Sequence, residues 1–224
     1  MAEQPGGMSN EELKRAASES VAGGGNIRER VRELTLQALQ SRKFDYAGFR
    51  DVMKSMTEGI SLGAEKRGQD VKHALSEAFS GMDQAMSKAA QASSLALKEL
   101  TDKSREFSQN ELKQGLDRMR QMETDFLDSV RQVSQSATST VKTEWQDLLV
   151  HAQRAGTDTG RVVSQTARDF SARMAATMTE GAIASMEAAR HVGERFAALA
   201  SGFLVGMSDA LKPSEKNAPE DKKK

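Results

Sequence analysis

The sequence predicts an all-α protein, built as an elongated antiparallel helical hairpin or bundle of long helices with an apolar stripe of eleven-residue (hendecad) period. The position of proline is the first observation behind this prediction. The three prolines are Pro5, Pro213 and Pro219, so none lies between Gly6 and Lys212. Proline inside a helix costs about 3 kcal/mol and is common in loops. A proline-free stretch of this length therefore favours nearly continuous helix.

Composition is the second observation. Of the 224 residues, 38% are hydrophobic and only 4% are aromatic. Globular chains are usually about 45–50% apolar. Because large side chains are scarce, we expect elongated helices around a thin core rather than a thick globular core.

The third observation is an apolar residue at nearly every eleventh position from Ala64 to Met207. Eleven residues make three turns at about 3.67 residues per turn, so such a column stays on one face of a nearly straight helix. A second, patchier column follows seven residues further on. From both columns we predict one surface, called here the apolar stripe, as the site through which the chain interacts: Leu75, Met86, Leu97, Met119, Phe126, Val130, Val141, Leu148, Val163, Phe170, Met174, Phe196 and Phe203.

The first helices have recognisable ends. Ser9 and Glu12 have the spacing of a capping box, which predicts a short helix running to about Val21 and ended by the glycines at 23–25. Asn26 is a candidate N-cap for a helix over 27–41. That helix would bury one face: Val31, Leu34, Ala38 and Leu39.

Further along the chain, Asp45 is placed to cap the next helix, and Phe49, Val52, Met53 and Met56 form its buried face. Three segments are candidate turns: 101–108, 134–140 and 156–160, where two glycines bracket capping-type residues. We expect two or three helices of about 45–55 residues, each roughly 70–80 Å long. The predicted division is a flexible N-terminal segment with a short helix (1–26), an elongated helical domain (27–211) and a disordered charged tail (212–224).

Small residues and a late apolar segment suggest where helices pack. Gly59 and Gly63, and likewise Gly202 and Gly206, are spaced as small-xxx-small pairs, which let two helices approach closely. Residues 196–207 form the most apolar part of the chain and are too short to span a membrane. We interpret this segment as a helix end buried against the N-terminal helices; the alternative is a patch for oligomerisation or for an apolar surface.

Chemistry-bearing residues do not form a recognisable site in the sequence. There is no cysteine, and His73, His151 and His191 have surface-pair spacings rather than those of a metal motif. The glycines match neither a phosphate loop nor a nucleophile elbow. The formal net charge is zero, which disfavours nucleic-acid binding. We predict a cytoplasmic protein without catalytic residues, metal, cofactor, nucleic-acid partner or transmembrane segment.

Two resemblances add to this interpretation. Residues 27–39 (IRERVRELTLQAL) and 57–68 (TEGISLGAEKRG) resemble an uncharacterised family of bacterial helical proteins over about the first 100 residues. Over residues 45–211, the Ala-, Met- and Ser-rich helices without cysteine or proline are similar to phasins. That similarity implies a cytoplasmic protein that coats polyhydroxyalkanoate granules through amphipathic, coiled-coil-forming helices.

The functional prediction is a non-enzymatic helical interaction protein, a phasin-like coat or surfactant on a hydrophobic granule or lipid surface. The alternative is a self-associating coiled-coil scaffold or adaptor that binds protein partners only. Both interpretations predict a homo-oligomer. A third alternative, a stress-protective chain with eleven-residue repeats, predicts little helix in dilute buffer.

Overall fold

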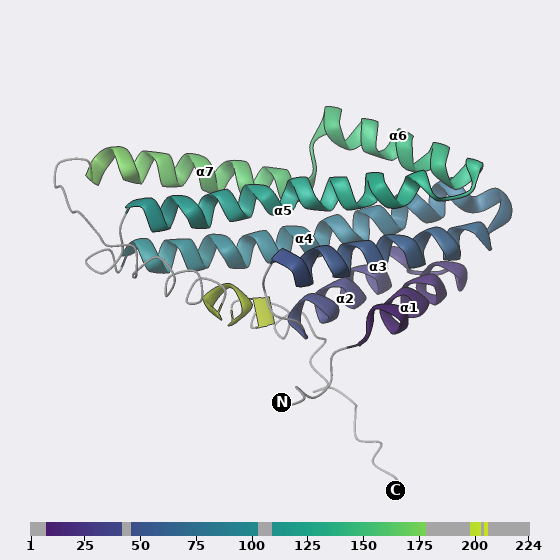
Figure 1. The fold of residues 1–224 in the computed structure, drawn as a ribbon. Helices are drawn as coiled ribbons and strands as arrows, with labels where there is room; N and C mark the ends of the chain where they lie inside the picture. The colour runs from purple at the N-terminus through teal and green to yellow at the C-terminus, as the bar shows by residue number, and fades with distance from the viewer. Residues whose placement is uncertain (1–7, 42–45, 103–108, 178–197, 203, 206–224) are drawn as a thin grey trace, which may run out of the picture.

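The chain folds into a bundle of helices (Figure 1). The computed structural model describes residues 8–41, 46–102, 109–177, 198–202 and 204–205. Within these ranges it contains the seven numbered α-helices, one 3-10 turn over Gly68–Asp70, further helical residues at 198–202 and 204–205, and no strand. The predicted all-α class and helical bundle are confirmed. The helices are α1 (Asn10–Ala22), α2 (Ile27–Gln40), α3 (Tyr46–Glu65), α4 (Val71–Asp102), α5 (Gln109–Gln135), α6 (Ser139–Ala155) and α7 (Asp158–Thr177).

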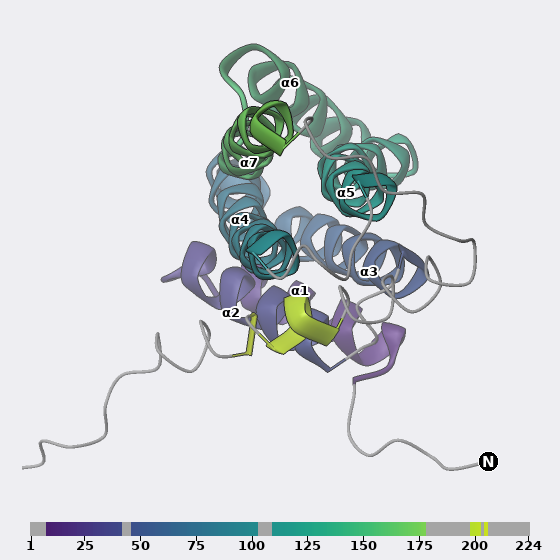
Figure 2. The ribbon, with the colours of Figure 1, turned by 90° about the vertical axis from the view of Figure 1, so that its left-hand side faces the viewer.

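Three layers make up the bundle. Helices α3 and α4 lie in the middle, α1 and α2 cover one side of them, and α5, α6 and α7 cover the other (Figure 2). Helices α6 and α7 follow one another along α5 and together form its return path (Figure 1). Long antiparallel neighbours therefore bury their apolar faces against each other, as the sequence predicts.

The first helix has the predicted capping box. The Ser9 backbone N–H donates to Glu12 Oε2 at 2.8 Å, and the Glu12 N–H donates to Ser9 Oγ at 3.3 Å. Helix α1 ends at the glycines, where Gly24 and Gly25 have φ of 67° and 66°. Asn26 does precede α2, but its side chain makes no capping hydrogen bond. The Arg30 guanidinium reaches back to two carbonyl oxygens, that of Ser20 in the last turn of α1 and that of Gly24 in the turn that follows.

Two of the predicted turns are present, and one break was missed. Helix α5 ends before the polar run at 136–138, and α6 ends before Gly156, whose φ is 81°. Residues 103–108, like Asp45, lie outside the described residues. None of the described helices reaches the expected length of about 45–55 residues, since the longest of them has 32 residues. The missed break follows α3, where Gly68 has a φ of 59° and turns the chain into α4.

Glycines set the distance between the outer and central layers. A β-carbon on Gly59 would lie 2.2 Å from the Lys14 carbonyl oxygen, and one on Gly63 would lie 2.4 Å from the Ser18 carbonyl oxygen. The predicted close approach at this glycine pair is therefore present, between α1 and α3. A β-carbon on Gly202 would meet nothing within 4 Å, and Gly206 lies outside the described residues.

The larger of two hydrophobic clusters, called here the main core, joins the layers around buried aromatic rings. The Trp145 side chain is fully buried, and its Nε1–H donates to Ser61 Oγ at 3.0 Å. Phe79 stacks on Phe126 with ring centroids 5.4 Å apart and meets Trp145 edge-on. The predicted buried face of α3 is confirmed, and so are Val31, Ala38 and Leu39 of α2; Leu34 is half-buried.

Both ends of the described chain contribute to the main core. Leu13, Ala17 and Val21 of α1 are fully buried there. This helix, which the sequence assigned to a separate N-terminal segment, packs into the bundle. Near the other end, Leu204 is 1% exposed and its carbonyl oxygen accepts a hydrogen bond from Gln40 Nε2 at 3.3 Å. Leu204, which belongs to the late apolar segment, is thus held by α2.

Candidate functional site

The apolar stripe lies inside the bundle wherever its side chains are described. Nine of its residues are at most 8% exposed: Leu75, Met86, Leu97, Met119, Phe126, Val130, Val141, Val163 and Phe170. Leu148 is partly buried against the main core. Met174, Phe196 and Phe203 lie outside the described side chains. The chain therefore covers most of this surface by itself, and its role as an interaction surface stays a prediction.

The buried stripe is divided between two clusters. Leu75, Met86, Phe126, Val130 and Val141 belong to the main core. The others belong to a smaller group, called here the second cluster: Ala90, Ala96, Leu97, Leu116, Met119, Val163, Phe170 and Ala200. Helices α4, α5 and α7 supply most of the second cluster. The α7 side chains described, which are those up to residue 172, belong to this cluster and not to the main core.

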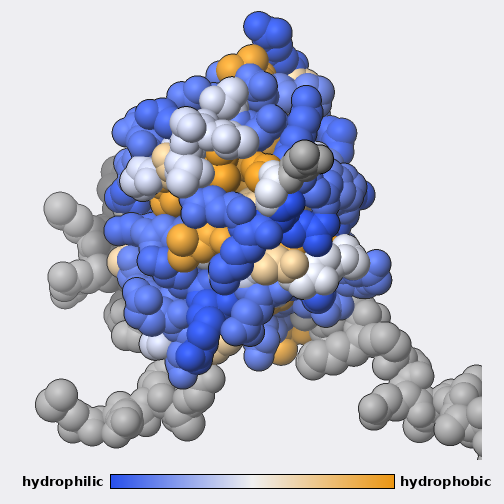
Figure 3. All heavy atoms as spheres, turned by 90° about the vertical axis from the view of Figure 1, so that its right-hand side faces the viewer, coloured by the Kyte–Doolittle hydropathy of each residue, from blue (hydrophilic) through white to orange (hydrophobic). Residues whose placement is uncertain are grey.

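Exposed apolar side chains are scattered among the described residues. The large ones are Leu62 of α3, Leu95 of α4, Val150 of α6 and Val205 near the end of the described chain, each 40–44% exposed. Figure 3 shows, on the end of the bundle that faces the viewer, apolar patches separated by hydrophilic side chains. Single exposed apolar residues are normal for a folded protein.

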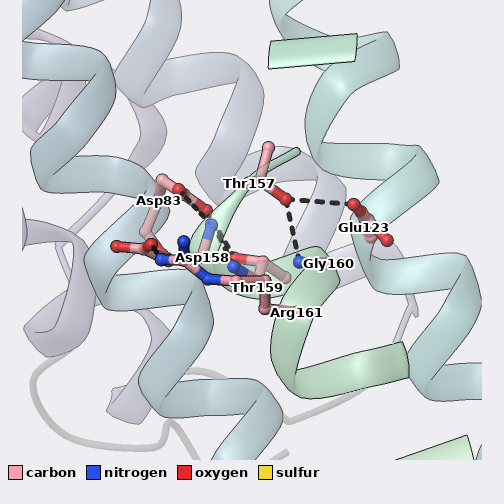
Figure 4. Close-up of polar contacts among 7 residues, drawn as sticks. All are labelled: Asp83, Glu123, Thr157, Asp158, Thr159, Gly160 and Arg161. Carbon is pink, nitrogen blue, oxygen red and sulfur yellow. Dashed lines mark hydrogen bonds and ion pairs between the residues drawn. The ribbon is translucent and has the colours of Figure 1, made fainter. Parts of the chain in front are cut away.

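A network of hydrogen-bonded polar side chains lies where the chain passes from α6 into α7 (Figure 4). Asp83 of α4, 8% exposed, points at the start of α7. Its carboxylate accepts hydrogen bonds from the backbone N–H of Asp158 at 2.7 Å and of Thr159 at 3.1 Å, and from Thr159 Oγ1 at 2.8 Å. An aspartate from one helix thus caps the N-terminus of another, where a negative charge is favourable.

A second carboxylate reaches the same turn from α5. Thr157 Oγ1 donates to Glu123 Oε1 at 3.0 Å and accepts from the Gly160 backbone N–H at 2.8 Å. Arg161 pairs with Asp158 on the outer side of the turn. These seven residues, called here the polar joint, connect α4, α5 and α7.

Burial raises the pKa of the Asp83 carboxyl above its ordinary value of 3.8, while hydrogen bonds from Thr159 and the positive charge of Arg161 oppose that rise. The ionised carboxylate loses hydration in this position, which is the cause of the upward shift. Asp83 can therefore hold the helix start, and its hold depends on its protonation state.

A groove of about 870 Å³ runs beside the polar joint. Its lining comes mainly from α4 and α7, and most of the lining side chains are polar. Ser94 and Thr166 meet across this seam, with their hydroxyl oxygens 2.9 Å apart. The contact between α4 and α7 is therefore partly polar and incompletely filled.

The polar joint carries no catalytic arrangement that we recognise, since its carboxylates accept from backbone and threonine groups rather than activate a nucleophile. Within the described ranges, no group of three or more His, Asp or Glu side chains could hold a metal ion. His73 and His151 are exposed, and His191 lies outside the described residues. None of the helices in these ranges combines the length and apolarity needed to cross a membrane.

Sequence reasoning placed the turn at 156–160 but missed Asp83 and Glu123. The residues that they contact lie 75 and 34 positions away, respectively. The only signal in the sequence for such partners was the run of capping-type residues at Thr157–Thr159. This run indicates the start of a helix, whose free backbone N–H groups need a hydrogen-bond acceptor.

The fold and the polar joint together define an all-α bundle protein in which helices are joined by apolar cores and one inter-helix cap. The chain belongs to a family of unknown function, DUF6781, which matches residues 3–213. The resemblance to an uncharacterised helical family covers only about the first 100 residues, whereas the family match spans nearly the whole chain. Comparisons with curated proteins and with solved structures gave no match.

Proposed function

We propose that this chain is a non-enzymatic helical interaction protein that acts as a scaffold or adaptor for protein partners. The observation that carries the proposal is the burial of the apolar stripe inside the chain's own bundle. A surfactant must present its apolar residues to a surface, whereas a scaffold uses them to stay folded.

The surface of the bundle supports the scaffold proposal. Many of the described charged side chains form solvent-exposed ion pairs with a neighbour on the same helix. Examples are Arg120 with Asp117 and Arg131 with Asp128. Such pairs add little to stability. A mixed polar surface of this kind suits contacts with proteins, and self-association would use it as well.

The second candidate is the phasin-like coat on a hydrophobic granule or lipid surface. One observation favours it: Val162 both lines the groove and packs against the second cluster, so a limited opening there would expose apolar residues. Adsorption would then follow the apolar area that reaches the surface.

Flotation separates the two candidates. The purified full chain is mixed with polyhydroxyalkanoate granules or apolar nanoparticles and centrifuged on a density gradient. A scaffold stays behind as a helical species of defined mass, because its stripe is already buried. Co-migration with the particles would contradict the scaffold proposal and favour the coat.

Two aspartate variants make that result specific. Val130 is fully buried and Val150 is 44% exposed. If the chain coats particles through the stripe, Val130→Asp abolishes co-migration and Val150→Asp retains it. Equal loss in both variants would indicate adsorption that does not depend on the stripe.

A further inference from the structure

The contact between α7 and the rest of the bundle differs from the other helix contacts. Described polar links across it include Asp83 with Thr159, Glu123 with Thr157, and Thr166 with Ser94. Each exchanges hydrogen bonds with water for hydrogen bonds within the protein, so each adds only a modest net stability. Among the described side chains, the apolar part of this contact lies in the second cluster.

The contact between α1 and α3 has the opposite character. Gly59 and Gly63 bring the two backbones together, and fully buried Leu13, Ala17 and Val21 fill the seam. Between α4 and α7, in contrast, the groove leaves space beside the helices. Opening in native proteins begins where buried apolar contact is least dense, so α7 is the element expected to separate first.

The two clusters allow α7 to separate without global unfolding. Among the α7 side chains that the structure describes, none belongs to the main core, which includes the aromatic rings of Phe126 and Trp145. Losing α7 would uncover Leu97 and Met119 on the bundle, and Val163 and Phe170 on α7. The main core would stay closed.

The residue between α6 and α7 allows α7 to rotate. Gly156 links α6 to α7 with a φ of 81°, and a β-carbon there would meet nothing within 4 Å. Glycine takes such dihedral angles without steric cost and can leave them as easily. Rotation at this residue can move α7 while α6 remains in the main core.

From these four observations we infer that α7 is a hinged cover: it turns about Gly156, the polar joint and the Ser94–Thr166 contact hold it closed, and its opening exposes the second cluster. This inference goes beyond the proposed function and requires neither of the two candidates. In a scaffold the exposed cluster would receive an apolar face of a partner, and in a coat it would be the first part to touch the surface.

Native-state hydrogen exchange of the full chain, followed by mass spectrometry of peptides, tests the inference. We expect amides in 160–172 to exchange at least about tenfold faster than amides in the middle of α3 and α4, through an opening that exposes little surface. Exchange of α7 at the same rate and with the same denaturant dependence as α3 and α4 would overturn it, because α7 would then open only with the whole molecule.

Substitutions test whether the polar joint holds α7 closed. Asp83→Ala removes three hydrogen bonds to α7, and we expect about tenfold or faster exchange in α7 with unchanged exchange in α1. Asp128→Ala is the matched control, since Asp128 pairs with Arg131 of the same helix at the surface. If Asp83→Ala accelerated exchange equally in every helix, its effect would be on the whole molecule. The proposed role of Asp83 in holding α7 closed would then be disproved.

A disulfide provides an independent test that leaves the polar joint intact. The chain has no cysteine, so Ser94→Cys with Thr166→Cys creates a single possible disulfide at a contact that is already close. In the oxidised variant we expect α7 to exchange as slowly as α4. After reduction we expect it to exchange at least as fast as in the parent, because the hydrogen bond between Ser94 and Thr166 is lost. Unchanged α7 exchange on oxidation, with the disulfide verified by mass, would overturn the hinge.

Discussion

Trp145 shows how a single polar atom is accommodated in an apolar core. The indole N–H needs an acceptor once it is buried, and Ser61 supplies it from α3. The sequence identified neither residue as buried, because the two lie 84 positions apart. The same holds for Asp83 and Thr159. Neither stands out in the sequence, because the fold alone brings the two residues together.

Ser61→Ala removes the acceptor and leaves the Trp145 N–H buried without a partner. We expect the free energy of unfolding to fall by about 1–3 kcal/mol. Urea unfolding followed by the fluorescence of this single tryptophan measures the change. Ser171→Ala, at an exposed serine, is the control and should be nearly neutral.

Asp83 should make stability depend on pH in an unusual direction. Because its pKa is raised in the folded state, the folded chain binds more protons than the unfolded chain between 3.8 and the raised value. The contribution of Asp83 to stability is therefore fully present below 3.8 and decreases as the pH rises through the raised pKa.

Asp83→Asn isolates this effect, since asparagine does not titrate. We expect the unfolding free energy of the parent to increase relative to the variant as the pH falls through this window. Urea titrations of both proteins at several pH values measure the difference. A difference that stays constant, or that reverses, contradicts the raised pKa.

At the scale of elements, the sequence predicts helices that have local signals. The capping box at Ser9, the glycines at 23–25 and the turn at 156–160 all lie where residues alone indicate a boundary. The break between α3 and α4 was missed because Gly68 is flanked by good helix formers, including Glu65, Lys66 and Arg67. A single glycine within such a run does not reveal its positive φ.

Gly63→Ala tests the close approach of α1 to α3. Its β-carbon would lie 2.4 Å from a backbone oxygen, which cannot move without displacing the helix. We expect a loss of about 1–3 kcal/mol in unfolding free energy, measured by chemical denaturation. Gly202→Ala is the matched control, because a β-carbon there has open space and alanine favours helix by up to about 1 kcal/mol. A stabilising Gly63→Ala would show that the helices are further apart.

At the scale of the whole molecule, the apolar stripe predicts which residues are buried better than it predicts how the helices are arranged. Its described residues are buried or half-buried, but they divide between two clusters because the chain turns between α4, α5, α6 and α7. A one-dimensional pattern cannot show that division. It depends on which faces meet after the turns, and on polar contacts such as that of Asp83 with Thr159.

Val130→Asp places an unpaired charge in the main core, whereas Val150→Asp places one at an exposed position. We expect the first variant to lose about 4 kcal/mol or more and the second to change by less than about 0.5 kcal/mol. Thermal unfolding followed by circular dichroism compares them. Similar melting curves for both variants and the parent would show that Val130 is not in the core.

The central claim is that one chain buries its own apolar stripe. Far-ultraviolet circular dichroism across a dilution series, with and without apolar nanoparticles, tests it most directly. We predict a strongly helical spectrum that is independent of protein concentration and unchanged by the particles. A largely unfolded spectrum in dilute buffer that gains helix on the particles, or only at high protein concentration, would contradict the account.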